Sequence, residues 1–154
     1  MARFGTTVTS SADPQVVFDY LADFSTVAQW DPGVSAARLI DGVAGSAGAR
    51  YLVTAEFFGR KIPLEYHCLM AERPADSGGS GRIELRAENA DFVSFDVITI
   101  RPAGLGCEVR YDADLALRGF RRVGDLGLRV LFEVVGRRAS GGLRQALAAL
   151  ASER

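Results

Sequence analysis

Apolar and polar residues alternate along most of the chain from Val34 to Leu117, which is the pattern of strands whose two faces differ. Breaks rich in Gly, Pro, Asp and Ser divide this region into six predicted strands: Val34–Asp41, Ala49–Phe58, Lys61–Glu72, Gly81–Asn89, Phe92–Arg101 and Cys107–Leu117. A further strand is predicted at Arg3–Ser10, which is rich in Thr and Val. Because the connections are short, neighbouring strands are expected to be antiparallel.

Two short helices are predicted between the first and second strands. Asp13 is a good N-cap, Pro14 suits the first helical position, and apolar residues follow at helical spacing. This predicts a helix from Pro14 to about Asp23. Ser25 is expected to cap a second, shorter helix that ends near Gln29, before the turn formed by residues 31–33, Asp-Pro-Gly.

After Gly119 the apolar period changes to that of a helix. One stripe carries Leu128, Leu131, Phe132, Val135, Ala139, Leu143, Ala146, Leu147 and Leu150. The pattern predicts a C-terminal helix of about 25 residues, roughly 37 Å long. Three glycines interrupt it, Gly136, Gly141 and Gly142. Either they reflect a composition rich in small residues, or they allow close approach to a sheet or a kink that opens space beneath the helix.

Composition and charge exclude several classes of protein. A chain of 154 residues predicts one domain spanning residues 1–154, and a net charge of −1 gives no general attraction to nucleic acid or membranes. The sequence predicts no signal peptide and no membrane span. Two cysteines without secretion signals predict a reducing, cytoplasmic location, and a single histidine without metal spacing predicts no metal or other cofactor. Seventeen Arg against one Lys indicate either the codon bias of a GC-rich bacterial genome or Arg-rich recognition of a partner.

The basic residues concentrate between Arg118 and Arg144, where seven arginines face only Asp125 and Glu133. This segment is either a solvated helix face or a surface for an anionic partner. The sequence leaves the oligomeric state open, a weak homodimer included.

The order of elements, with four motifs, resembles the START-like (SRPBCC) superfamily and within it the polyketide cyclase/dehydrase branch. The motifs are ADPQVVFDYLAD at residues 12–23, WDPGV at 30–34, GCEVRY at 106–111 and GL at 142–143. The resemblance implies the helix-grip fold, an α+β architecture in which a curved antiparallel sheet of about seven strands wraps around a long C-terminal helix. It also implies a cavity for hydrophobic small molecules. The superfamily has no shared catalytic motif to transfer.

Strand alternation indicates which residues face such a cavity. Three of the four tyrosines fall on the apolar faces, and buried hydroxyls need partners. They either reach a wet rim of the core or serve as polar groups in an apolar pocket. Trp30, the only tryptophan, is expected at the pocket mouth, either as a lid packed on the core or as a ligand contact. The predicted ligand-binding residues are Trp30, Tyr51, Val53, Phe57, Tyr66, Leu85, Phe95, Tyr111, Phe132 and Val135.

Candidate catalytic groups are few. His67 shares a polar face with Lys61 and Glu65, and Cys68 has no inward histidine to activate it. In Phe92–Arg101 the apolar positions change phase, which predicts a β-bulge near Asp96 and Val97. Asp96 is therefore the remaining acid or base, and it would act with Tyr51, Tyr66 or Tyr111.

Three hypotheses follow. The first is non-catalytic binding of a hydrophobic small molecule, lipid or polyketide-like. The second is a polyketide cyclase or dehydratase that acts on an aromatic polyketide. The third is a regulatory or toxin-like protein whose partner is another protein.

Overall fold

A computed structural model describes residues 2–57, 59–90, 92–117 and 125–153. Seven antiparallel strands form one sheet in the order β1-β7-β6-β5-β4-β3-β2. The strands are β1 (Ala2–Ser10), β2 (Val34–Asp41), β3 (Arg50–Phe57), β4 (Arg60–Glu72), β5 (Gly81–Glu88), β6 (Phe92–Ala103) and β7 (Gly106–Leu117). Strand β1 pairs with β7 rather than with β2, because the helical segment that follows β1 carries the chain across to the other edge.

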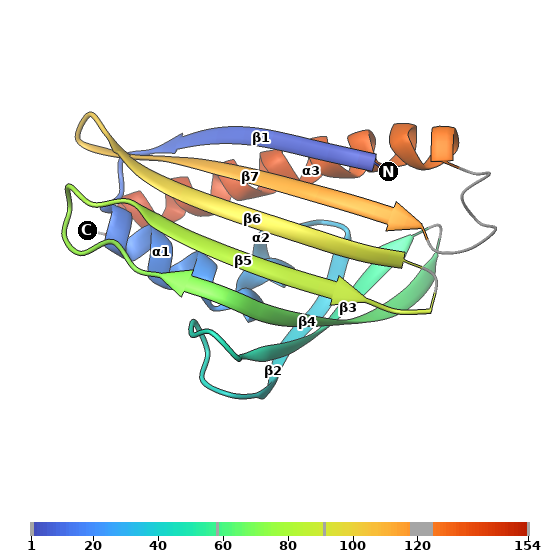
Figure 1. Ribbon diagram of the computed structural model, residues 1–154. Helices are drawn as coiled ribbons and strands as arrows, with labels where there is room; N and C mark the ends of the chain where they lie inside the picture. Colours follow the sequence, from blue (N-terminus) through green and yellow to red (C-terminus); the bar gives the residue numbers. More distant parts are fainter. Residues whose placement is uncertain (1, 58, 91, 118–124, 154) are drawn as a thin grey trace.

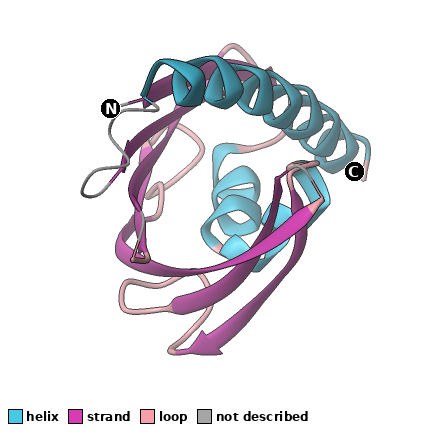
Figure 2. Cartoon of the chain, turned by 90° about the vertical axis from the view of Figure 1, so that its right-hand side faces the viewer, coloured by secondary structure: helices cyan, strands magenta, loops and turns pink. Residues whose placement is uncertain are grey.

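The sheet curves strongly, and its concave side faces the helices (Figures 1 and 2). The long helix α3 (Asp125–Ser152) runs along β1 and spans the opening of the curve. The shorter helices α1 (Pro14–Ala22) and α2 (Val27–Trp30) lie inside the curve, with the 3₁₀ turn η1 (Phe24–Thr26) between them. This is the helix-grip fold expected from the sequence.

The helix starts follow their capping residues. Asp13 caps α1 by accepting a hydrogen bond from the Gln15 backbone N–H at 2.8 Å, and Pro14 occupies the first turn. The second helical segment differs from expectation, because Asp23 rather than Ser25 provides the cap. The Asp23 carboxylate accepts from the Ser25 backbone N–H at 3.2 Å and from its hydroxyl at 2.7 Å.

One predicted irregularity is wrong, and others were not anticipated. Strand β6 keeps an unbroken register with both neighbours, so there is no bulge near Asp96 and Val97. Register shifts occur instead in β4, between Cys68 and Met70, and twice in β2, between Val34 and Ala36 and between Leu39 and Asp41. The shift in β4 places Met70 opposite Glu84, so this side chain leaves the inward face to which simple alternation assigned it.

Two of the three glycines in the part of α3 whose side-chain surroundings are described, residues 135–152, lie at close contacts. A Cβ at Gly136 would overlap the Phe4 ring on β1, and one at Gly142 would overlap the Trp30 carbonyl oxygen. Neither position has room for a side chain. These glycines therefore let α3 approach the sheet edge and α2 closely, whereas a Cβ at Gly141 would meet nothing within 4 Å.

Candidate functional site

A cavity of about 320 Å³ lies between the concave face of the sheet, the end of α2 and helix α3. Most of the described residues on its wall are apolar, and they come from both edges and the centre of the sheet as well as from α3. They include Phe4, Val34, Val53, Ala55, Ile62, Leu64, Ala113, Leu115, Val135, Ala139 and Leu143. A volume of this size lies at the lower end of the range for small-molecule sites.

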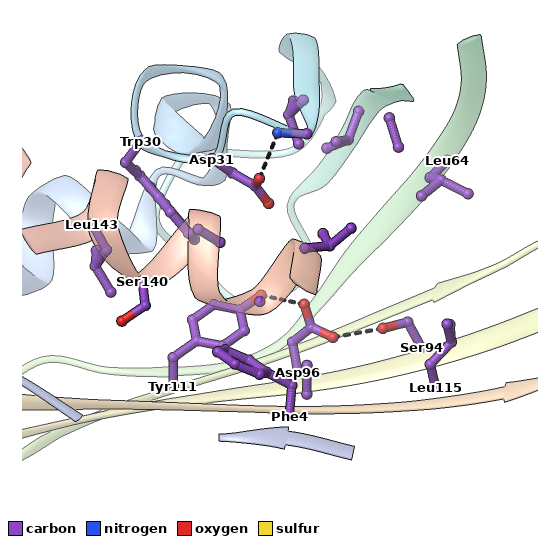
Figure 3. A pocket seen from close by; sticks show the side chains of 18 of the residues that line it. Phe4, Trp30, Asp31, Leu64, Ser94, Asp96, Tyr111, Leu115, Ser140 and Leu143 are labelled. Carbon is purple, nitrogen blue, oxygen red and sulfur yellow. Dashed lines mark hydrogen bonds between the residues drawn. The ribbon is translucent and has the colours of Figure 1, made fainter. Parts of the chain in front are cut away.

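Trp30 ends α2 and forms one wall of the cavity (Figure 3). Its side chain is buried, and its ring packs edge-on against Tyr111 with the ring centroids 5.7 Å apart. Its indole Nε1 is the one buried side-chain nitrogen or oxygen without a hydrogen-bond partner in the described part of the chain. An unpaired buried donor is costly, so this N–H favours a partner that can accept a hydrogen bond.

Asp96 is the central polar group of the cavity. Its carboxylate accepts hydrogen bonds from the Ser94 hydroxyl at 2.7 Å and from the Tyr111 hydroxyl (Figure 3). Ser94 and Asp96 are both nearly fully buried, because alternation in β6 turns them to the concave side of the sheet. Burial raises the pKa of Asp96 to about 6, and the two hydrogen bonds oppose part of that rise.

Two phenols share these surroundings. Burial, with Asp96 nearby as the next cause, raises the pKa of Tyr66 and that of Tyr111 well above 10. A hydrogen bond with the Ser94 side chain partly opposes the rise in the pKa of Tyr66. Both hydroxyls therefore remain protonated at neutral pH and can act as hydrogen-bond donors or weak acids.

Asp31 supplies a second carboxylate on the opposite wall (Figure 3). It follows Trp30 directly, and its Oδ1 accepts a hydrogen bond from the Gly33 backbone N–H at 2.8 Å. Burial raises its pKa, while the Gly33 hydrogen bond acts in the opposite direction. The turn between α2 and β2 thus both redirects the chain and places an acid beside the indole.

Five of the ten predicted ligand-binding residues lie on the cavity wall: Trp30, Val53, Tyr66, Tyr111 and Val135. Tyr51, Leu85 and Phe95 are not among the residues that line it. The side chains of Phe57 and Phe132 lie outside the described residues.

The three residues that miss the cavity do so for separate reasons. The Tyr51 hydroxyl donates to the Ala22 carbonyl at 3.3 Å and accepts from the Gly45 backbone N–H at 2.9 Å, so it ties α1 to a loop at the core's rim. Leu85 is fully buried in the core. Phe95 pairs with Arg86 and Asp114 on the outer face, because β6 has no bulge to turn it inward.

Sequence reasoning missed several polar wall residues: Thr6, Asp31, Ser94 and Ser140. Thr6 and Ser140 form a hydrogen bond of 2.7 Å that joins β1 to α3. The sequence pattern marks Asp31 only as a turn residue, although its position next to Trp30 is a usable signal. Ser94 shares the strand phase of Asp96, Ile98 and Ile100, and that phase would have placed both polar residues inward.

The remaining candidates lie where alternation predicted. His67 is exposed, with its Nε2 3.2 Å from Glu65. Cys68 is buried, and burial raises the pKa of its thiol. Within the described ranges, no cluster of three or more His, Cys, Asp or Glu could hold a metal, and no helix is long and apolar enough to cross a membrane.

The basic segment between Arg118 and Arg144 is described only in part. Residues 118–124 and the side chains of residues 125–134 lie outside the described structure. Of the seven arginines, Arg137, Arg138 and Arg144 can be placed, and all three are exposed on α3.

Similar solved structures share the fold at low sequence identity. A protein from Thermus thermophilus has 17% identity and a TM-score of 0.73, with 99% of each chain covered. The Zhui aromatase/cyclase from a Streptomyces species has 15% identity and a TM-score of 0.72, covering 99% of this chain and 94% of that one. A START superfamily protein from Mycobacterium smegmatis has 16% identity and a TM-score of 0.61, covering 95% of this chain and 99% of that one.

The comparison with curated protein sequences found no match. A family model described as polyketide cyclase / dehydrase and lipid transport, however, matches residues 1–153, which is almost the whole chain. Together with the curved sheet that grips α3, this match establishes that the chain belongs to the polyketide cyclase / dehydrase and lipid transport family.

Proposed function

We propose that this protein binds a hydrophobic small molecule, lipid-like or polyketide-like, in the cavity between the sheet and α3. The observation that carries the proposal is the cavity itself, an apolar chamber of about 320 Å³ with a few polar groups at defined positions. Ser94 and Asp96 point inward although burial of polar groups is costly. Apolar side chains would stabilise this region better if it served only as a packed core.

Trp30 provides a direct test, because it is the only tryptophan and it lies on the cavity wall. Titration with a panel of polyaromatic compounds and fatty acids should find at least one compound that shifts or quenches its emission, with saturation at one ligand per chain. Organic extracts of the purified protein, analysed by mass spectrometry, should contain a bound compound. If no compound changes the emission, none is extracted and calorimetry shows no binding heat, the proposed binding function is wrong.

A second candidate function is an aldol-type cyclisation followed by loss of water, and the contact between Asp96 and Tyr111 favours it. Asp96 with a pKa of about 6 is ionised at neutral pH and is a stronger base than an ordinary carboxylate. It would take a proton from the carbon between two ketones of the substrate. The resulting enolate would attack a second carbonyl of the same chain, and the new alkoxide would take a proton from Tyr66 or Tyr111. The protonated Asp96 would then protonate the hydroxyl that leaves as water. The tyrosinate would take the second proton of the same carbon as the double bond forms, so that both residues return to their starting protonation states.

Substitution of Asp96 separates binding from catalysis. With a substrate found by extraction or screening, Asp96→Asn should lower turnover at least about a hundredfold while the dissociation constant changes little. Tyr111→Phe should lower turnover less, since Tyr66 remains as a donor. Unchanged turnover in Asp96→Asn would remove this residue from the reaction, and binding without any chemical change would leave the first function alone.

A further inference from the structure

Among the described residues, the polar part of the cavity wall carries acidic side chains and no basic ones. Asp31 and Asp96 both line it, and among the described residues on the wall there is no Arg, Lys or His. The groups that contact Asp96 are the hydroxyls of Ser94 and Tyr111, which donate hydrogen bonds but bring no positive charge. Within the described part of the chain, the negative charge of the carboxylates is therefore solvated by dipoles and no cation on the wall compensates it.

The two carboxylates lie on opposite walls and act on the same space. Asp96 projects from β6 at the centre of the sheet, whereas Asp31 projects from the turn after α2 (Figure 3). Each feels the other, since the charge of Asp31 contributes to the raised pKa of Asp96. An anionic group that enters between them is repelled by both carboxylates. It also loses part of its hydration shell as it enters the cavity.

The hydrogen-bonding capacity of the same wall is also asymmetric. The two carboxylates are acceptors, whereas the buried Trp30 Nε1 is a donor without a partner in the described residues. A hydroxyl group can donate to a carboxylate and also accept from a donor. A carboxylate ligand can only accept, and so it would leave Asp31 and Asp96 facing a like charge.

We propose that the cavity selects ligands whose polar end is an uncharged, hydroxyl-bearing group, and that it rejects fatty acids and other carboxylates. This inference rests on the proposed binding function and narrows it. It favours hydroxylated cyclic compounds over free fatty acids. Two acids that would repel an anion serve here as acceptors for the hydroxyl protons of the ligand.

The test uses two probes with the same hydrophobic body. Naphthalen-1-ylmethanol and naphthalene-1-carboxylate share the ring system and a one-carbon substituent, and they differ in charge at neutral pH. Calorimetric titration of the full chain should give a dissociation constant at least about tenfold lower for the alcohol than for the carboxylate, because like charges interact strongly in a partly desolvated site.

Three variants assign the discrimination to the carboxylates. Asp96→Asn and Asp31→Asn should each reduce the ratio of the two dissociation constants at least about threefold, mainly through tighter binding of the carboxylate. Asp41→Asn is the matched control, because it removes the same charge from the exposed end of β2, and it should leave the ratio unchanged. Circular dichroism checks the fold of each variant, and Asp31→Asn supplies the test by itself if Asp96→Asn does not fold.

The outcomes distinguish this inference from the function on which it rests. If the carboxylate binds as tightly as the alcohol or more tightly, charge selection is wrong while the binding function stands. If the preference for the alcohol persists unchanged in both Asp variants, the carboxylates are not its source and the inference is again wrong. If neither probe binds, the inference is wrong, and the binding function is decided separately by the Trp30 titration and the extraction.

Discussion

Asp96 shows how a single residue can conflict with the stability of the fold that holds it. Its carboxylate is nearly fully buried, and its hydrogen bonds with Ser94 and Tyr111 offset only part of the cost of removing it from water. The pKa of about 6 measures what remains of that cost. A residue of this kind is typical of sites where function, rather than packing, dictates the side chain.

The pH dependence of stability tests this directly. In the unfolded chain an Asp titrates near pH ~3.9, whereas the pKa of Asp96 in the folded chain is about 6. Since the folded state holds its proton more tightly, the free energy of unfolding should fall as the pH rises from about 4 to about 6, and this contribution should be constant above that window. The difference of about two pKa units corresponds to about 3 kcal/mol.

Asp96→Asn removes this dependence. Compared with the wild type, its free energy of unfolding should be higher by about 1–3 kcal/mol above neutral pH and should lose that advantage near pH ~4. Urea denaturation at several pH values in this range measures the difference in the free energy of unfolding between the two proteins. The other titrating groups contribute equally to both proteins, so their effect cancels in the difference. A difference between the two proteins that does not vary with pH would show that Asp96 keeps an ordinary pKa.

At the scale of the element, α3 contains glycines that are explained by contacts with other elements and not by the helix alone. Glycine inside a helix costs about 1 kcal/mol relative to Ala, so the three glycines beyond the first turn weaken α3 considerably. Gly136 and Gly142 are explained by their contacts with Phe4 and Trp30, and both of these partners line the cavity. The close approach of α3 therefore helps to position the cavity wall, whereas Gly141 has no such contact.

Neighbouring glycines should respond in opposite directions to the same substitution. Gly142→Ala would place a methyl group against the Trp30 carbonyl and should lower the free energy of unfolding by about 2 kcal/mol, since backbone must move. Gly141→Ala should raise it by about 0.5–1 kcal/mol, because only helix propensity changes. Thermal and urea denaturation of both variants give the two values, and stabilisation by Gly142→Ala would contradict the packing described for α2 and α3.

At the scale of the whole molecule, the sheet and α3 enclose a cavity as well as a core. The fully buried core is formed largely by β5, β6 and β7 with α1, and by the end of α3, as Leu85, Ile100, Val109 and Leu147 illustrate. The cavity occupies the rest of the concave side. A domain that tolerates such a space gives up packing that would otherwise stabilise it, and this is the usual balance at a binding site.

A larger side chain in the cavity should weaken binding without unfolding the protein. Ala55→Leu adds three carbon atoms at a β3 position on the cavity wall, so it should weaken binding of naphthalen-1-ylmethanol at least about tenfold and leave the melting temperature within a few degrees of wild type. Ala36→Leu, at an exposed position of β2, is the control and should change neither. Loss of the fold in Ala55→Leu would mean that the position is already tightly packed, and undiminished binding would place the ligand elsewhere.

The sequence by itself determined the elements and their order. For most strand positions it also determined the face of the sheet on which the side chain lies. Those features depend on local periodicity and on caps and turns such as Asp13 and Pro14, which act within a few residues. One wrong prediction also concerned a short stretch of sequence. The expected bulge in β6 came from the assumption that inward positions must be apolar, and Ser94 and Asp96 break that assumption because they face a cavity.

Only the tertiary structure decided which inward residues meet in the cavity and which fill the core. Tyr51 and Tyr111 both fall on apolar strand faces in the sequence, yet one anchors a loop near α1 and the other contacts Asp96 and Trp30. That difference depends on sheet curvature and on how closely α3 approaches, through contacts between residues far apart in the chain, such as Phe4 with Gly136 and Trp30 with Gly142. Strand alternation fixes the side to which a residue points, whereas long-range packing fixes what it meets there.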